Sequence, residues 1–310
     1  MADLGVSIDG RTPIGDIPAL ARAAEAGGAS TLWIACHLFL RDPIATAALA
    51  LSATRHIKAA LMAMSPYSVH PVYIAMAAAT LDEMFPGRVI LSLGAGAPAD
   101  LAAAGITADK PLRTISETLT RCRALFAGEA AGGRRLANAP REIPIMLAAS
   151  RENMLRLAGR EADGVLISAA TAPAFVRACL DIAASTRNQF RRIAIVYVRV
   201  AASEKAAMDA VRRPIGFVLR GPHHAPNIRL SGAKLDQAAL ARAYAAEDWD
   251  TVARLVDDDM VRRHAACGTP AQVRQKLSEY RAIGLDEIVI GGIDDADGVA
   301  AALAAARGGS

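Results

Sequence analysis

The sequence predicts a (β/α)₈ barrel, or TIM barrel, that forms a single domain over residues 1–310. Short apolar runs, typical of strands buried on both faces, alternate along the chain with helical segments. This alternation recurs eight times, and a chain of 310 residues with 53% hydrophobic residues can enclose one large core. The predicted strands are residues 4–8, 31–35, 57–63, 89–93, 143–148, 164–168, 193–200 and 287–290.

The repeating unit is clearest where the third and fourth strands follow one another. Pro71 begins an Ala- and Met-rich helical segment that Pro86-Gly87 ends, and the next strand runs into Gly94-Ala95-Gly96. Two strands joined by a crossover helix are parallel, and the connection is right-handed. The predicted helices are residues 17–26, 43–54, 72–84, 111–125, 152–162, 174–184 and 297–306.

A long segment interrupts the repeat after the seventh strand. Residues 203–263 are rich in alanine and charged residues, and we expect them to form an extended helical insertion. Thr269, Pro270 and Gln272 then form a capping-box pattern, which indicates that the regular barrel helices resume there.

An open, doubly wound sheet is the alternative fold. It would use Gly94-Ala95-Gly96 as a dinucleotide-binding loop after its first strand. Here the loop follows the fourth strand, and Ala99 stands where a third glycine is required. No acidic residue ends a strand about twenty residues later. The barrel is therefore the preferred prediction.

Charge and cysteine content exclude several classes of protein. The net charge is +4 and the pI about 9.0, but lysine and arginine are scattered and aromatic residues are few, so nucleic-acid binding is not predicted. The N-terminus does not resemble a signal peptide, and no apolar run reaches about 18–20 residues, so no membrane association is predicted. The four cysteines lack metal-ligand or redox spacing, as is typical of reduced thiols in a cytoplasmic protein: Cys36, Cys122, Cys179 and Cys267.

Side chains capable of acid–base chemistry are scarce at the ends of the predicted strands, where a barrel carries its active site. We find no carboxylate pair, no nucleophilic triad and no set of metal ligands there. Small residues are frequent instead, and they allow a flat ring to approach the backbone. This pattern predicts that a cofactor supplies the chemistry.

Five stretches of sequence carry a family resemblance: TLWIACHLFLRDPIA, SPYSVHPVYIAMAAATLDEMFPGRVILSLGAG, KPLRTISETLTRCRALFAGE, IPIMLAASRENMLRLAGREADGVLIS and ACGTPAQVRQKLSEYRAIGLDEIVIGG. Together they resemble the bacterial luciferase-like superfamily of flavin- and coenzyme F420-dependent oxidoreductases. The branch most similar is that of the methylenetetrahydromethanopterin reductases. Residues 203–263 lie outside the resemblance.

The resemblance implies a barrel that binds coenzyme F420 or FMN at its strand ends. With F420, the protein would transfer a hydride to or from a small organic substrate. An FMNH2-dependent monooxygenase that uses O2 and a separate reductase is the alternative, and a flavin-binding protein without turnover is a further one. The resemblance also implies a homodimer.

The same resemblance assigns roles to individual residues. His37 would lie beside the edge of the cofactor ring as a contact and proton donor, although a structural, hydrogen-bonded histidine is the alternative. The bulge formed by Met62, Ala63 and Met64 would lie behind the ring, with a non-prolyl cis peptide at or next to Met62–Ala63. The loop Gly94-Ala95-Gly96 would lie under the ribityl chain.

A phosphate site is implied where the fifth strand meets its helix. Free N–H groups at a helix N-terminus bind anions, and Arg151 would add a charged contact. The alternative is that Ser150 only caps the helix. The complete set of implied cofactor contacts is Cys36, His37, Met62, Ala63, Met64, Gly94, Ala95, Gly96, Ala148, Ala149, Ser150, Arg151, Asn153 and Ser168.

Several positions depart from the reductase branch. Cys36 stands where that branch usually has an acidic residue, and Ser7 where it has a glutamate in the first strand. A buried carboxylate is the natural proton source for a pterin reductase, so these changes argue against reduction of methylenetetrahydromethanopterin. Cys36 is either a reactive thiol beside His37 or, as we favour, a buried inert one.

The sequence RGPHHAPNIR at residues 220–229 interrupts the helical insertion. We expect it to form a lid over the substrate, with a solvated loop as the alternative. The candidate substrate contacts are Ser7, Ser65, His223 and His224.

Overall fold

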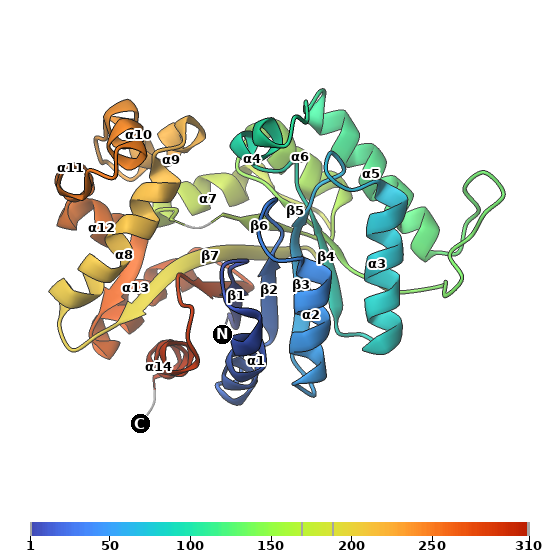
Figure 1. The fold of residues 1–310 in the computed structure, drawn as a ribbon, viewed down its shortest axis with the longest axis horizontal. Coiled ribbons are helices and arrows are strands. Elements are labelled where there is room, and N and C mark those ends of the chain that lie inside the picture. Colours follow the sequence, from blue (N-terminus) through green and yellow to red (C-terminus); the bar gives the residue numbers. More distant parts are fainter. Residues whose placement is uncertain (1, 169, 188, 309–310) are drawn as a thin grey trace.

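The structure, a computed structural model, describes residues 2–168, 170–187 and 189–308. Its strands form one parallel sheet that closes into a barrel, because β6 pairs with β7 (Figure 1). The ring order is β1-β2-β3-β4-β5-β6-β7-β9, which confirms the predicted eight-stranded barrel. The strands are β1 (Asp3–Ile8), β2 (Thr31–Ala35), β3 (Lys58–Met64), β4 (Val89–Leu93), β5 (Ile145–Ala148), β6 (Gly164–Ile167), β7 (Arg191–Val200), β8 (Ala265–Gly268) and β9 (Glu287–Gly291).

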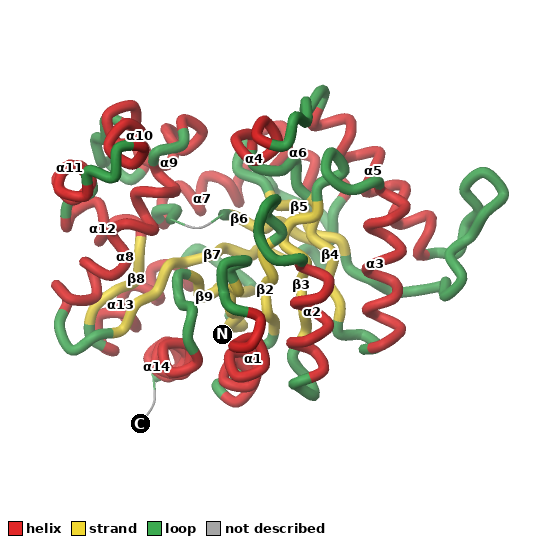
Figure 2. The backbone as a smooth tube through the Cα atoms, viewed as in Figure 1, coloured by secondary structure: helices red, strands yellow, loops and turns green. Residues whose placement is uncertain are grey.

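Helices cover the outside of the ring, and a second group of helices lies beside the outer end of β7 (Figure 2). The first group is α1 (Ile17–Ala26), α2 (Pro43–Ser52), α3 (Pro71–Met84), α5 (Pro111–Phe126), α6 (Glu152–Glu161), α7 (Pro173–Ile182), α13 (Pro270–Arg281) and α14 (Ala296–Arg307), with the short α4 (Pro98–Ala103) and η1 (Ile14–Asp16) in loops. The second group, here called the insertion, is α8 (Glu204–Leu219), η2 (Pro222–His224), α9 (Ala225–Leu230), α10 (Gln237–Ala245), α11 (Trp249–Leu255) and α12 (Asp258–His264). These helices occupy the segment for which a helical insertion is predicted.

Alternate residues of the strands face the inside of the barrel and form a core of their own. Its members are Trp33, Ala60, Ile90, Met146, Leu166, Ile193, Ile195 and Val289, with Met62 and Ala148 packed against them. A larger cluster fills the layer between the strands and the outer helices, and a third forms the centre of the insertion.

The amino-terminal end of the barrel is closed by a buried carboxylate. Glu287 is 1% exposed, accepts a hydrogen bond from the Trp33 indole at 2.8 Å and pairs with Arg191 at 3.2 Å. Burial raises the pKa of Glu287, and the Trp33 and Arg191 contacts oppose that rise. A Cβ atom at Gly5 would lie 2.4 Å from the Glu287 carboxylate, so only glycine fits there. This end is filled, and the opposite mouth is left for a ligand.

β8 is the main departure from the predicted order. β7 is long enough to pair with β9 from Ile193 to Tyr197 and with β8 from Tyr197 to Val200. The sequence of β8, AACG, is short and rich in alanine, and its extended state depends on pairing with the free end of β7. β5 also begins later than predicted, at Ile145, because Pro144 has no N–H group to donate to a neighbouring strand.

Candidate cofactor and substrate site

Three very small residues meet at the mouth of the barrel, where β3, β4 and β5 end. A Cβ atom at Gly94 would lie 3.0 Å from the Ala63 Cβ and 3.6 Å from the Ala148 Cβ. Met62 and Ala148 cover the interior core directly below. We call Ala63, Gly94 and Ala148 the shelf, because together they leave a flat area that any larger side chain would fill.

The predicted non-prolyl cis peptide is confirmed at Met62–Ala63. The pairing of β3 with β4 shifts register between Leu61 and Met64, so the chain bulges at this point. The two methionines then separate: Met62 packs with the interior core, whereas Met64 is buried with the outer layer. Of the two side chains, Met62 is the one beside the shelf.

The loop after β4 is tied to the end of β3. The Ser65 hydroxyl donates to the Ala95 carbonyl at 3.2 Å and accepts from the Tyr67 N–H at 3.3 Å, and the Gly94 N–H donates to the Met64 carbonyl at 3.1 Å. Gly96 has a positive φ of 85°, which favours glycine. Ser65 is 6% exposed. Its hydroxyl therefore supports the loop, although the sequence made it a candidate substrate contact.

The N-terminus of α6 has the form expected of an anion site. The N-cap residue is Arg151, whose side chain makes no capping hydrogen bond, so the alternative role of Ser150 as the helix cap is wrong. Ser150 is half-buried, and Arg151 and Asn153 are exposed at the first turn. Ala149 is buried with the outer layer and its N–H donates to the Leu166 carbonyl at 3.1 Å, so neither its side chain nor its N–H is free for a ligand. The N–H groups of this turn remain available to an anion.

His37 is exposed at the end of β2 and has a partner that the sequence analysis did not identify. Its Nδ1 atom lies 3.6 Å from the Asp100 carboxylate on α4. Asp100 lies in the first turn of α4, just after the Gly-rich loop. This helix was not predicted from the sequence, so Asp100 was not considered among the residues at the strand ends. A histidine beside a carboxylate can hold and pass on a proton.

Cys36 does not share this position. Its side chain packs with the outer layer and its thiol lies 3.6 Å from the Ile34 carbonyl. Burial, and secondarily the charge of Asp42, raises the pKa of the Cys36 thiol far above its ordinary value. The thiol is protonated and inert, in agreement with the preferred prediction for this residue.

The two insertion histidines differ in environment. The ring centroids of His223 and His224 are 4.3 Å apart, yet His223 is exposed and His224 only 6% exposed. Burial lowers the pKa of both, and nearby Arg151 lowers that of His223 further. The charge of Arg151, at the first turn of α6, thus acts on the exposed ring of His223. His223 is the one placed to meet a ligand there.

The other side of the mouth carries polar groups, several of which the sequence analysis passed over. Ser7 is half-buried on β1 and faces inward, since Gly5 two residues earlier does so. Asp9 follows that strand and pairs with Arg11 at 3.2 Å. Tyr197 of β7 lies against Gly291, where a Cβ atom would be 3.3 Å from its ring. Reading the end of the first strand would have found Asp9, whereas Tyr197 lies in the middle of the predicted seventh strand and is not revealed by strand ends.

Two further features lie near or beyond the mouth. Ser168, at the end of β6, is exposed, and its carbonyl accepts a hydrogen bond from Thr171 at 3.0 Å.

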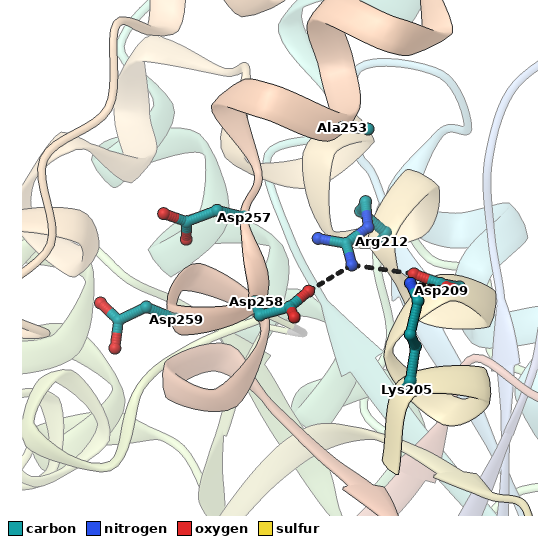
Figure 3. A pocket seen from close by; sticks show the side chains of 7 residues that line it. All are labelled: Lys205, Asp209, Arg212, Ala253, Asp257, Asp258 and Asp259. Carbon is teal, nitrogen blue, oxygen red and sulfur yellow. Dashed lines mark hydrogen bonds and ion pairs between the residues drawn. The ribbon is translucent and has the colours of Figure 1, made fainter. Parts of the chain in front are cut away.

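Away from the strand ends, a hollow between α8 and α12 is lined by Lys205, Asp209, Arg212 and three consecutive aspartates (Figure 3). There the 9%-exposed Arg212 bonds Asp209, Asp258 and the Val256 carbonyl. We interpret this hollow as an ion-pair network that holds the insertion together.

The closed parallel barrel, its shelf and its uncapped helix define a cofactor-binding (β/α)₈ barrel. The chain belongs to the luciferase-like monooxygenase family, whose family model matches residues 2–287. None of the helices in the described part of the chain is long and apolar enough to cross a membrane.

Known relatives match along nearly the whole chain. It is 30% identical over 289 residues to a 5,10-methylenetetrahydromethanopterin reductase of Archaeoglobus fulgidus, covering 87% of both chains. It is also 30% identical over 306 residues to the reductase of the same name from Methanolobus tindarius, covering 93% of both. The coenzyme F420-dependent tetrahydromethanopterin reductase structure from Methanopyrus kandleri superposes with a TM-score of 0.84 at 22% identity, covering 98% of this chain and 97% of that one.

Proposed function

We propose that this protein is a coenzyme F420-dependent oxidoreductase that transfers a hydride to or from a small organic substrate. The observation that carries the proposal is the shelf of Ala63, Gly94 and Ala148, whose small size lets a planar ring approach three neighbouring strand ends closely. The uncapped N-terminus of α6 supplies a second fit, because it can receive the phosphate of such a cofactor.

When bound and reduced, a deazaflavin supplies a hydride. The protein's own residues would position and protect it. Met62 and the backbone around Ala63 would lie behind the ring, Ser150 and Arg151 would hold the phosphate, and the protein would exclude water from the ring face. His37, paired with Asp100, would hold or move a proton at the ring edge.

The names of the reductase relatives support an enzyme over a binding protein without turnover, and the names of the F420-dependent relatives and of the F420-dependent structures that share this fold support F420. They do not extend to the substrate. Ser7 replaces the glutamate of the reductase branch, so we propose a substrate other than methylenetetrahydromethanopterin. The family likeness also supports, as further proposals, a homodimer and a cytoplasmic location, of which light scattering tests the first.

An FMNH2-dependent monooxygenase supplied by a separate reductase is the second candidate, and the description of the family model favours it. The two candidates differ in the behaviour of the reduced, bound cofactor in air. A deazaflavin would persist, because it carries hydride and reacts slowly with oxygen, whereas reduced FMN would be consumed.

Titration of the purified protein with F420 and with FMN, followed by fluorescence quenching, tests the proposal. We expect tighter binding of F420, and at least about tenfold weaker binding by Ser150→Ala/Arg151→Ala, since a charge-assisted contact contributes at least about 1.4 kcal/mol. Arg113→Ala on the exposed face of α5 is the matched control. Equal binding by the double variant and the wild type would contradict the phosphate assignment. Absence of F420 binding would contradict the proposal as a whole.

A further inference from the structure

A single aromatic residue lies where the interior of the barrel meets the insertion. Tyr197 is on β7, in register with Gly291 of β9. Its ring lies over Gly291 and Gly292, at each of which a Cβ atom would come within 3.3 Å of the ring. It also packs against the core of the insertion. These two glycines make the space that the ring occupies.

The register of the strands places Tyr197 at the same level as Ser7. In the pairing of β1 with β9, Gly5 lies opposite Val289 and Val6 opposite Ile290. The same register places Ser7 beside Gly291, and Gly291 in turn pairs with Tyr197 of β7. Residues at these alternate positions face the inside of the barrel. Two hydroxyl groups therefore lie on the β1–β9–β7 side of the mouth, in addition to the shelf formed by β3, β4 and β5.

The Tyr197 hydroxyl differs from those of the other buried or half-buried tyrosines. The hydroxyls of Tyr67, Tyr244 and Tyr280 each donate to a backbone carbonyl. Among the described residues, none accepts a hydrogen bond from Tyr197. Tyr197 is half-buried, and its hydroxyl is not among the buried side-chain atoms that lack a partner, so the hydroxyl is open to the mouth and can donate to a ligand.

Charge and burial keep this hydroxyl protonated. Burial raises the pKa of Tyr197 to about 12, and the negative charge of Asp9 adds to the effect, while Arg11 opposes it. Tyr244 contributes a smaller effect that also raises the pKa of Tyr197. A phenol in this state is a hydrogen-bond donor and an acid, and a poor base.

We propose that Tyr197, assisted by Ser7, donates a hydrogen bond to the carbonyl oxygen of a small neutral ketone or enone, which makes this side of the mouth the substrate site. The inference rests on the proposed function. As the carbonyl carbon would gain a hydride from reduced F420, which is oxidised in turn, the carbonyl π electrons would move to oxygen, and the oxygen would take the Tyr197 proton to give an alcohol. Water then returns a proton to the phenolate. An alkoxide is more basic than a phenolate, so the proton moves to the substrate oxygen once the hydride has arrived.

Tyr197→Phe tests the proposal with cyclohexanone as the probe. We expect the infrared carbonyl stretch of cyclohexanone, bound to protein loaded with oxidised F420, to shift to lower wavenumber in the wild type and to lose that shift in Tyr197→Phe. Tyr73→Phe on α3, where the tyrosine is 66% exposed, is the matched control and should keep the shift. An unchanged shift in Tyr197→Phe, or no binding of cyclohexanone to the loaded wild type, would overturn the proposal.

Turnover gives a second measurement. With reduced F420 and cyclohexanone under anaerobic conditions, kcat of Tyr197→Phe should fall roughly 100-fold, the effect expected of a lost general acid. Gly291→Ala should also lower kcat, because its Cβ would lie 2.9 Å from Ile195 and would press on the Tyr197 ring. Equal kcat values for the wild type and Tyr197→Phe would overturn the role of Tyr197.

The F420 titration separates this inference from the proposed function. Tyr197→Phe should bind F420 as the wild type does and should show the same thermal unfolding temperature. If the wild type fails to bind F420, the proposed function fails. If F420 binds but the infrared shift and the turnover of cyclohexanone are the same in the wild type and in Tyr197→Phe, only this inference fails.

Discussion

The two sides of the barrel mouth are built differently. On the β3–β4–β5 side, Ala63, Gly94 and Ala148 expose almost no polar side-chain atoms, and the neighbouring loop satisfies its own hydrogen bonds through Ser65. On the β7–β9–β1 side, Tyr197 and Ser7 carry hydroxyls toward the mouth, and the insertion packs beside them. The first side suits a flat ring that brings its own chemistry, and the second suits recognition of a substrate. Because each side draws on different strands, changes on one should leave the other intact.

The largest expected effect is that of filling the shelf. Gly94→Leu would place a side chain where the Cβ atom alone lies 3.0 Å from Ala63. Overpacking of about 2–3 kcal/mol should weaken F420 binding roughly 100-fold, as measured by fluorescence quenching. Gly15→Leu is the matched control, because a Cβ atom at Gly15 has nothing within 4 Å. If Gly94→Leu bound F420 as tightly as Gly15→Leu, the shelf would not be the ring site.

The next effect concerns the attachment of the insertion to the barrel. The fully buried Asn227 of α9 accepts from the Ala172 N–H at 2.9 Å and donates to the Ala170 carbonyl at 2.8 Å, in the loop after β6. Asn227→Ala leaves two buried backbone groups unsatisfied and should lower the free energy of unfolding by about 2–3 kcal/mol. Hydrogen exchange at the Ala172 amide should accelerate, while F420 binding is retained.

The control for this change is Asn138→Ala, which removes an exposed hydrogen bond to Glu83. Its unfolding free energy should change by less than about 0.5 kcal/mol. Loss of F420 binding in Asn227→Ala, at temperatures where the protein remains folded, would show that the two sides of the mouth are coupled.

A smaller change in stability is expected from the ion-pair network of the insertion. Arg212→Leu removes the donor to the buried Val256 carbonyl, and its carboxylate partners, Asp209 and Asp258, are half-exposed. We expect a loss of about 1–2 kcal/mol in urea unfolding. Lys205→Met breaks only an exposed pair with Asp209 and should cost less than about 0.5 kcal/mol. Equal effects of the two substitutions would mean that the buried contacts of Arg212 contribute nothing to the free energy of unfolding.

The smallest effect is a dependence of stability on pH from the insertion histidines. Burial lowers the pKa of His224 to about 3, so the folded state keeps this ring neutral while the unfolded state binds a proton near pH 6.5. Stability from this group is therefore present above about pH 6.5 and is lost as the pH falls toward 3. As the pH falls from about 7.5 to 6.0, this group should lower the free energy of unfolding by about 0.8 kcal/mol.

Urea unfolding at both pH values checks this sign. His224→Gln should lose about 0.8 kcal/mol less than the wild type over that interval, whereas His56→Gln, at an exposed position, should behave as the wild type. A variant that shows the full wild-type decrease would place the titrating group elsewhere.

The sequence predicts the barrel well because each strand is an apolar run between a helix and a loop, and that pattern is local. It predicts the cis peptide at Met62–Ala63 only through the family resemblance, since nothing in the run KAALMAM itself demands it. β8 escapes prediction because its four residues are extended only through pairing with the end of β7. Asp100 and Tyr197 escape for a related reason, since their relation to His37 and Ser7 arises from the closure of the ring.

A crystal structure of the protein with oxidised F420 would show whether the shelf holds the cofactor ring. We expect the deazaflavin ring against Ala63, Gly94 and Ala148, the phosphate at the first turn of α6, and the Tyr197 hydroxyl on the open side of the ring. F420 bound away from the strand ends, or a ring on the β7–β9 side with the shelf covered by protein, would show that the shelf is not the cofactor site.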